Sequence, residues 1–357
     1  MIIYFIVLFL VMILLTMSER LKTAPNKFSF YQIIAGVVLV LFEGLRSSNV
    51  GTDTNNYVGI FNGLKYNTHA FKNSDSTIES GYMFLQNIAF AISSEYWSLL
   101  TVIAIVGVFI SLKSFQLLSL NFKISVFLFI TLASYLFLFN GARQGLAACV
   151  YGIAFFYLVN KKLWHYVLWV FIATLFHKTA LIMLPFFYIL HWKLSVKKML
   201  LFVLVSLIAL LYLSTFLSLF EDNVQERYAV YETRGAQGGF SLGLFFIVLS
   251  FYLVYLRKKI TLINQYRYNI YLNTCVFSSL IYFVVIATGR DVNFIRLSLY
   301  FMIGYFLIWP IIFKDVKFFQ SSFGKIIFYT IHLLFFAVYL SKMSNLTPYQ
   351  FNFNLFY

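Results

Sequence analysis

Residues 124–140 read ISVFLFITLASYLFLFN, and after the short polar turn of 141–143 residues 144–159 read QGLAACVYGIAFFYLV. Both runs are continuously apolar rather than alternating, which favours a spanning helix over a strand of a membrane barrel. Each approaches the about 20 residues that cross a hydrocarbon core some 30 Å thick. The stretch therefore predicts two membrane-spanning helices joined by a tight polar turn.

The rest of the chain follows the same rhythm. Of its 357 residues 61% are hydrophobic and 11% are charged, and the mean hydropathy is +0.84. A soluble domain cannot hide so much apolar surface from water. Short polar clusters interrupt the apolar runs about every 15 to 25 residues, as membrane spans require. The chain is predicted to be an all-α polytopic membrane protein.

Charge distribution and the spacing of cysteines and histidines argue against several classes of function. The net charge is +15, but the basic residues are scattered between apolar runs, so we expect no nucleic-acid partner. Cys149 and Cys275 lie inside apolar runs without metal-ligand spacing, which indicates packing. No pair of histidines has such spacing either, so we expect no metal and no cofactor. Residues 1–16 lack a positive leader region and a cleavage site, which predicts a retained span.

Thirteen apolar segments can be marked along the chain. They cover 1–17, 31–46, 81–94, 98–112, 124–140, 144–159, 163–177, 179–191, 198–219, 241–256, 269–288, 293–313 and 325–341. No internal repeat or separate soluble region is visible. We therefore expect a single transmembrane domain over residues 1–357.

Basic clusters in short loops predict which side faces the cytoplasm. The clusters include Lys161 with Lys162 and Arg257 to Lys259. Placing them inside makes loops 46–80 and 220–240 external, together with the short turns near 140, 178 and 290. Between the external loop 46–80 and the basic loop at 113–123 the chain must then cross the membrane an odd number of times, yet two apolar segments, 81–94 and 98–112, lie there. Because segment 81–94 is short, we expect it to be re-entrant or interfacial, which leaves about 12 spans.

The two kinds of cation are distributed differently by this topology. Most lysines fall on the inner side, whereas six arginines fall outside: Arg46, Arg143, Arg227, Arg234, Arg290 and Arg296. An arginine at or within an apolar segment is costly and indicates a functional site. Its planar guanidinium suits bidentate binding of phosphate, which a lysine point charge does not match. Pairing with external acids remains the alternative for Arg227 and Arg234.

Two external motifs come first along the chain. Gly44-Leu45-Arg46 is followed by Val50-Gly51-Thr52-Asp53-Thr54-Asn55-Asn56-Tyr57. There Asp53 is suited either to capping the next helix or to orienting a sugar or an arginine. The second motif, Phe139-Asn140-Gly141-Ala142-Arg143-Gln144, puts a sharp reversal before Arg143. The guanidinium and the helix N-terminal amides then face one water layer, which predicts an anion site.

Two further motifs follow on the same predicted face. Phe176-His177-Lys178-Thr179 places a histidine at the mouth of a helix hairpin, where it can act as a general base or simply bond a nearby carbonyl. His177 is a better candidate base than Asp53 or Glu79. The stretch from Thr288 to Arg296 carries Arg290 and, about two turns into a span, Arg296. Loop 220–240, with Arg234, is long enough to cover a substrate.

These motifs, in this order, resemble the EpsG-like branch of the Wzy polymerases. The resemblance rests on GLR, VGTDTNNY, Asn-x-x-Arg-Gln at the start of a span, and FHKTALIMLPF, and it extends to the late span with its arginines. It covers most of the chain. Five positions are carried over with weight, namely Arg46, Asp53, Arg143, His177 and Arg290.

The resemblance implies a bacterial plasma-membrane glycosyltransferase, similar in architecture to the C-type membrane glycosyltransferases. Its donor and acceptor are oligosaccharides linked to undecaprenyl diphosphate, joined at the outer face without a nucleotide sugar. The product is O-antigen, capsule or exopolysaccharide, and chain-length regulator and flippase proteins are further partners. A metal-independent reaction fits the residues, because fixed cations can stabilise a departing diphosphate and His177 can accept a proton. The predicted catalytic residues are His177 and Asp53. The residues predicted to bind the diphosphate or the substrate are Arg46, Arg143, Arg290, Arg296, Lys178 and Arg234.

Two other functions remain open on the sequence. A ligase that moves the finished glycan to another acceptor needs the same donor site, although a bulky acceptor favours a larger external loop than those present. A transporter or flippase of an anionic or lipid-linked solute should show repeat symmetry and polar residues at mid-membrane. The polar groups of this chain instead gather at one face.

Overall fold

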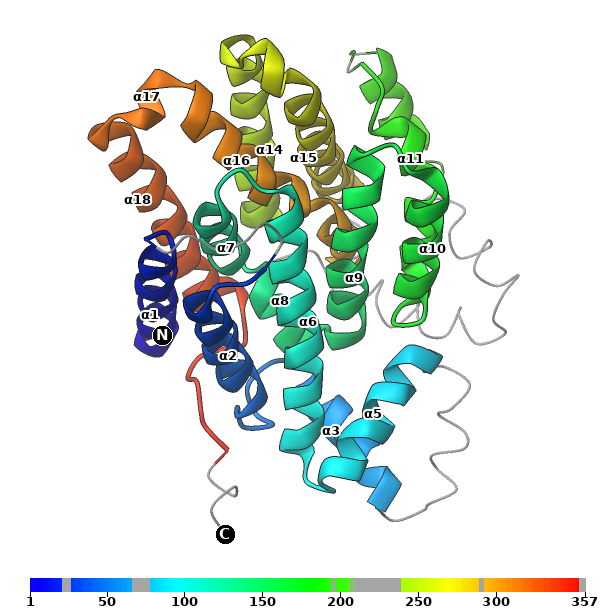
Figure 1. Cartoon of the computed structure of the whole chain (residues 1–357). Coiled ribbons are helices and arrows are strands. Elements are labelled where there is room, and N and C mark those ends of the chain that lie inside the picture. The colour runs from blue at the N-terminus through cyan, green and yellow to red at the C-terminus, as the bar shows by residue number, and fades with distance from the viewer. Residues whose placement is uncertain are drawn as a thin grey trace. The chain divides into compact units, whose positions relative to one another are not determined.

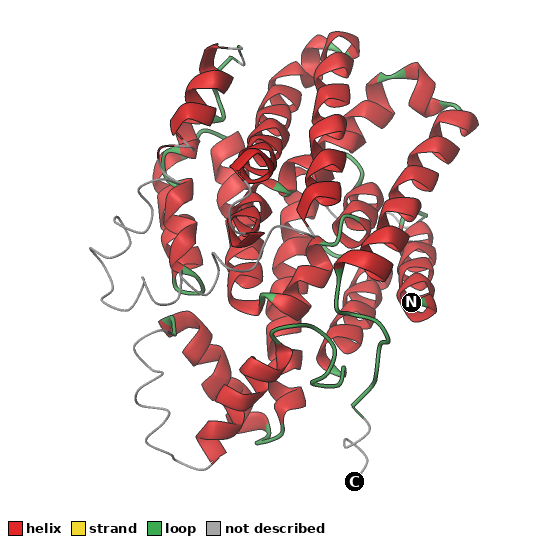
Figure 2. Cartoon of the chain, turned by 180° about the vertical axis from the view of Figure 1, so that it is seen from behind, coloured by secondary structure: helices red, strands yellow, loops and turns green. Residues whose placement is uncertain are grey.

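The computed structural model describes residues 1–20, 27–65, 78–193, 195, 197–205, 208, 239–288 and 292–352. Throughout these residues the regular elements are helices joined by short loops, as Figure 2 shows, and the only strand-like contact is the isolated bridge between Arg46 and Phe351. The predicted all-helical class is confirmed.

The described chain forms two compact units, Met1–Phe187 with Lys317–Tyr357, and Tyr188–Val316. The first contains α1 (Ile2–Ser18), α2 (Phe30–Gly44), α3 (Thr54–Lys65), α5 (Ser80–Ile92), α6 (Tyr96–Leu118), α7 (Phe122–Thr131), α8 (Ser134–Asn140), α9 (Ala142–Val159), α10 (Leu163–Thr174), η2 (Lys178–Met183), α17 (Lys317–Gln320), α18 (Ser322–Val338) and η5 (Tyr339–Met343). The second contains α14 (Gly239–Leu256), η3 (Arg257–Lys259), α15 (Leu262–Thr288), η4 (Val292–Phe301) and α16 (Ile303–Asp315). The boundary in the sequence falls within α11 (Phe186–Ile189).

Polar residues between the apolar runs begin several helices of the first unit. Ser29 and Gln32 form a reciprocal capping box at the start of α2. The side chains of Asn121 and Ser321 accept the amides of Ile124 and Gly324 at the starts of α7 and α18. Such caps satisfy amides that have no partner within the helix, so the loop residues fix where the helices begin.

Helix α6 is the centre of the first unit and packs against α2, α5 and α9, while α10 packs on α9 (Figure 1). Gly44 shows how close α2 comes to α6, because a Cβ there would overlap Oγ1 of Thr101. Helices α3, α5, α6 and α9 share an apolar cluster that includes Phe61, Tyr82 and Leu146. This cluster supports the helix ends that carry the candidate site.

Two segments predicted as straight spans are broken. Residues 124–140 form α7 and α8, bent by 43° at a break where Ala133 has a left-handed backbone with φ 64°. Helices η4 and α16 are bent by 43° within the predicted span 293–313. Continuous apolar sequence does not reveal the first break, since neither Leu132 nor Ala133 is a proline or glycine. The second break is at Met302, two positions before Gly304.

Among the described residues five helices are long and apolar enough to cross a membrane, or up to seven if each bent pair is one span. The predicted segments 1–17, 31–46 and 163–177 form helices of 17, 15 and 12 residues, which are short for a straight crossing. Most of segment 198–219 lies outside the described residues. The structure therefore shows a multi-pass arrangement of apolar helices.

The second unit is built around a helix hairpin. Helices α14 and α15 lie side by side, and α16 and η4 pack on α15 (Figure 1). The hydroxyls of Ser250 and Tyr305 both donate to the carbonyl of Cys275 at 3.2 and 3.0 Å, joining α14, α15 and α16. Cys149 and Cys275 are both buried and free of disulfides.

Candidate functional site

The first two motifs meet at the turn between α8 and α9. Gly141 lies between the two helices, and Arg143 occupies the first turn of α9. The Thr52 amide donates to Oδ1 of Asn140 at 2.9 Å, and Oγ1 of Thr54 donates to the Phe139 carbonyl at 3.0 Å. The VGTDTNNY and FNGARQ motifs, far apart in sequence, therefore lie together.

Gly51 makes this approach possible. Its φ is +102°, a backbone that side chains rarely adopt, and a Cβ would lie 2.7 Å from the Phe139 carbonyl oxygen. Any larger residue would force the loop away from the α8–α9 turn. The glycine of the first motif thus serves the contact with the second.

Arg46 is buried inside this assembly. Its side chain is 1% exposed, it donates to the carbonyls of Glu43 and Phe139, and it lies 4.4 Å above the Phe139 ring. The C-terminal tail runs alongside it, because the Ser47 amide donates to the Gln350 carbonyl at 2.8 Å. Arg46 thus links the end of α2 to Phe139 of α8 and to Phe351 of the tail.

Asp53 directly precedes α3. Its backbone carbonyl accepts the amides of Asn56 and Tyr57 at 3.1 and 3.2 Å, as expected of the residue before a helix. Its side chain is half-buried. The capping position suggested by the sequence is therefore the one that its backbone occupies.

The third motif is brought to α5 by a close backbone contact. The Gly81 amide donates to the Leu175 carbonyl at 2.8 Å, and a Cβ on Gly81 would lie 2.7 Å from that oxygen. This contact fixes the first turn of α5 against the end of α10. As a result Glu79, just before α5, lies beside His177, just before η2.

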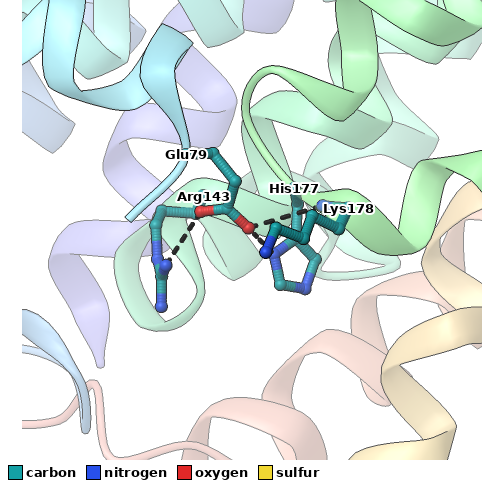
Figure 3. Close-up of polar contacts among 4 residues, drawn as sticks. All are labelled: Glu79, Arg143, His177 and Lys178. Carbon is teal, nitrogen blue, oxygen red and sulfur yellow. Dashed lines mark hydrogen bonds and ion pairs between the residues drawn. The ribbon is translucent and has the colours of Figure 1, made fainter. Parts of the chain in front are cut away.

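Glu79 joins the second and third motifs through its carboxylate (Figure 3). Oε2 accepts Nη1 of Arg143 at 2.8 Å, and Oε1 lies 2.9 Å from Nδ1 of His177. Oε1 also accepts the Lys178 backbone amide at 3.4 Å. Residues 79, 143 and 177–178 thus form one polar cluster at the ends of three helices, which we call the Glu79 cluster.

Burial differs sharply within the Glu79 cluster. The Glu79 side chain is 6% exposed, whereas Arg143 and His177 are 31% and 27% exposed. Burial raises the pKa of the Glu79 carboxyl, but the hydrogen bond from His177 and the charge of Arg143 outweigh it and hold the pKa below its usual value. The buried residue is therefore an anion that orients two partly exposed side chains.

This arrangement suits general-base chemistry at His177. An ionised carboxylate only accepts hydrogen bonds, so Nδ1 carries the proton that it shares with Glu79. The other ring nitrogen, Nε2, is then the basic one. Glu79 also stabilises the imidazolium that forms when Nε2 takes up a proton, as acidic partners of catalytic histidines do.

The remaining predicted site residues divide between the second unit and the undescribed part. Arg296 lies in η4, half-buried. Arg234 and Arg290 lie outside the described residues. Of the predicted set, the structure brings Arg143, His177 and Lys178 together through Glu79, and it brings Arg46 and Asp53 to the neighbouring α8–α9 turn.

Glu79 is the residue whose importance the sequence understated. Sequence reasoning ranked it behind His177 as a base and gave it no partner. One signal was available, since Glu79 is one of only 12 acidic residues and precedes an apolar segment on the side where the sequence analysis places six arginines. In the described part of the chain no three His, Cys, Asp or Glu side chains are grouped to hold a metal ion.

Fold and cluster together define a multi-pass membrane protein with an acid-oriented histidine and an arginine at its helix ends. The family model of the EpsG family matches residues 29–351, and the chain belongs to that family, which is part of the Wzy-type polymerase group. The resemblance seen in the sequence is thereby confirmed. No curated protein matches the chain, and no solved structure does either.

Proposed function

We propose that the protein polymerises oligosaccharide repeat units carried on undecaprenyl diphosphate, at the outer face of a bacterial plasma membrane. The growing glycan leaves its lipid diphosphate and joins the next lipid-linked unit. Membership of the EpsG family supports a polysaccharide polymerase. The observation that carries the chemistry is the Glu79 carboxylate, which holds Arg143 and His177 side by side.

His177 acts as the base in this proposal. The acceptor hydroxyl gives its proton to Nε2 while its oxygen bonds to the anomeric carbon of the donor sugar. The bond from that carbon to the diphosphate oxygen breaks, and the diphosphate leaves with the electron pair. Glu79 keeps Nδ1 protonated and balances the imidazolium. Asp53, near the α8–α9 turn, orients the acceptor or an arginine.

Arg143 is the cation placed best for the departing diphosphate. Its guanidinium is partly exposed at the first turn of α9, and Glu79 fixes its orientation. Fixed cations stabilise charge that develops on a leaving group. We assign Lys178, Arg234, Arg290 and Arg296 to the same diphosphate or the sugar beside it. Arg46 was predicted from the sequence to bind the substrate as well, but because it is 1% exposed and donates to two backbone carbonyls we assign it instead to support of the turn that carries Arg143.

The proposed topology has about 12 spans in one membrane domain, with loops 46–80 and 220–240 outside and an architecture like that of the C-type glycosyltransferases. Helix α5, of 13 residues, does not cross. Cysteine substitutions at Ser80 and Ser94 should then be labelled from the same, external side. Labelling of the Ser94 substitution from the cytoplasm alone would contradict this topology.

The polymerase proposal is tested by the glycans of cells that carry His177→Ala or Arg143→Ala. We expect single repeat units, seen as one short band in place of a ladder. His165→Ala is the matched control for the histidine, because His165 is exposed and stacks on Tyr157 with ring centroids 4.9 Å apart. Lys123→Ala is the control for a lost ion pair, since Lys123 pairs with Glu19 away from the cluster.

A normal ladder from well-expressed His177→Ala and Arg143→Ala proteins would overturn the assignment. If the protein were a ligase, the inactive variants would instead leave long glycan on its lipid carrier. If it were a flippase, they would leave single repeat units on the cytoplasmic side. We also propose that no divalent metal takes part. Purified protein should therefore extend lipid-linked units in a chelator, and loss of activity that magnesium or manganese restores would contradict that part.

A further inference from the structure

The second unit contains a pocket that the proposed reaction does not use. Its volume is about 260 Å³, and it lies between the chain at 190–193, Arg257 of η3 and the first turns of α15. The polar and aromatic side chains that line it are His191, Trp192, Lys193, Arg257, Tyr266 and Asn269. Every lining residue belongs to the second unit.

The pocket wall is fixed by a buried amide. Nδ2 of Asn273, in α15, donates to the carbonyls of Leu190 and Trp192, both at 2.8 Å. Asn273 is buried, and two such bonds hold the 190–193 chain against α15. The pocket is therefore a built feature of the unit.

The position of the pocket matches the headgroup layer of a membrane. Residues 240–259 and Leu262–Thr288 are both long and apolar enough to span, so the turn between them lies at a membrane surface. Tyr266 and Asn269 follow Leu262 by four and seven residues, or about 6 and 10 Å along the helix. That depth is the interfacial layer, where tyrosine and tryptophan side chains gather.

The chemistry of the lining favours an anion. Among the described residues neither Lys193 nor Arg257 has a carboxylate within ion-pair distance. Asp315, the acid at the end of α16, is occupied by Thr261 and by Nδ2 of Asn264, which donates to it at 2.8 Å. Two unpaired cations at one pocket suit a phosphate group.

Asn269 indicates that the ligand also carries a hydrogen-bond donor. Its Oδ1 is buried and accepts no hydrogen bond from the described residues, and a buried acceptor without a partner is costly. A hydroxyl beside the phosphate would satisfy it. The exposed rings of Trp192 and Tyr266 are suited to the boundary between a headgroup and its acyl chains.

We propose that this pocket binds the headgroup of an anionic phospholipid that carries a free hydroxyl, such as phosphatidylglycerol. The basic residues of 193–198 and 257–259 predict that this end of the unit faces the cytoplasm, so the lipid belongs to the inner leaflet. Lys193 and Arg257 bind the phosphate, and Oδ1 of Asn269 accepts the hydroxyl. The proposal does not depend on the reaction at the Glu79 cluster.

The test is native mass spectrometry of the purified full-length protein offered phosphatidylglycerol, phosphatidylcholine or free glycerol phosphate. The unaltered protein should retain phosphatidylglycerol over phosphatidylcholine. The pair of changes Lys193→Gln and Arg257→Gln should weaken that retention about twenty-fivefold, at about fivefold for each cation. The control pair Lys258→Gln and Lys259→Gln removes the same charge from the same turn without lining the pocket. Because these exposed cations do not touch the lipid and salt screens them, this change should weaken retention less than about threefold.

Equal losses in the two pairs would overturn the proposal, because general surface charge would then explain retention. Equal retention of the two lipids would overturn it too. Saturable glycerol phosphate binding with no retained lipid would show a site for a free anion instead. If the Lys193 and Arg257 pair does not fold, Asn269→Asp decides, since an added carboxylate in the pocket should lower phosphatidylglycerol retention and leave phosphatidylcholine retention unchanged.

Discussion

Two acid–arginine groups lie in the first unit, and they differ in burial. At the end of α2, Glu43 and Arg46 are 0% and 1% exposed. In the Glu79 cluster the acid is buried but Arg143 and His177 are about one-third exposed. In the sequence Glu43 and Arg46 lie three positions apart at the end of one apolar run, whereas Glu79 and Arg143 lie 64 positions apart and meet only in the fold.

The contacts of the two arginines explain the difference. Arg46 donates to backbone carbonyls and stacks on Phe139, while both carboxyl oxygens of Glu43 lack a hydrogen-bond partner within the described residues. Arg143 pairs directly with a carboxylate that also holds a histidine. A buried guanidinium that bonds carbonyls supports the backbone. One that is partly exposed beside a titratable group is available to a substrate.

The largest expected effect is on folding, at Arg46. Arg46→Ala removes a buried side chain with its carbonyl contacts and leaves a cavity, which should lower the free energy of unfolding by about 3 to 5 kcal/mol. Arg143→Ala, at a partly exposed pair, should lower it by only about 1 kcal/mol. Thermal unfolding of the purified proteins in detergent measures both. If Arg46→Ala unfolds like the unaltered protein and yet cannot polymerise, Arg46 belongs to the substrate site.

The next effect is on activity, at Arg143. Arg143→Lys keeps a cation near Glu79 but loses the planar guanidinium, so polymerisation should slow about tenfold while the unfolding temperature stays nearly constant. The comparison is Arg267→Lys, which makes the same change on the predicted cytoplasmic side. Rates with purified lipid-linked units provide the measurement. Full activity of Arg143→Lys would show that a point charge suffices there.

Much of the fold could be predicted from the sequence because apolar runs form the helices and polar residues lie where the helices begin. The apolar runs 98–112 and 144–159 correspond to α6 and α9, and polar residues such as Asn121 begin helices where the runs begin. The bend at Ala133 could not be predicted, since nothing in its local sequence requires a left-handed backbone. The number of membrane spans could not be predicted either. It depends on how long each helix is, and the residues at which helices begin and end are hard to place from the sequence.

The sequence predicted which residues belong to the candidate site better than it predicted which of them contact one another. Arg143 and His177 stand out because charged and titratable groups are rare beside apolar runs. Their link through Glu79 depends on the contact of Gly81 with Leu175, which joins residues almost a hundred positions apart. Periodicity and charge carry no information on such a contact. The same holds for the burial of Arg46, which depends on the return of the C-terminal tail.

The smallest effect concerns the charge of Glu79 and its dependence on pH. The pKa of Glu79 is lower in the folded protein than its usual value, so its ionisation stabilises the fold. That contribution is fully present above the pKa of the unfolded chain and is lost as the pH falls through the lower folded value. Glu79→Gln cannot ionise, so its unfolding temperature should fall less on acidification than that of the unaltered protein. Glu95→Gln, at the exposed start of α6, is the control and should keep the acid sensitivity of the unaltered protein. Identical acid profiles for Glu79→Gln and the unaltered protein would show that the carboxylate does not hold Arg143 and His177 as a charged partner.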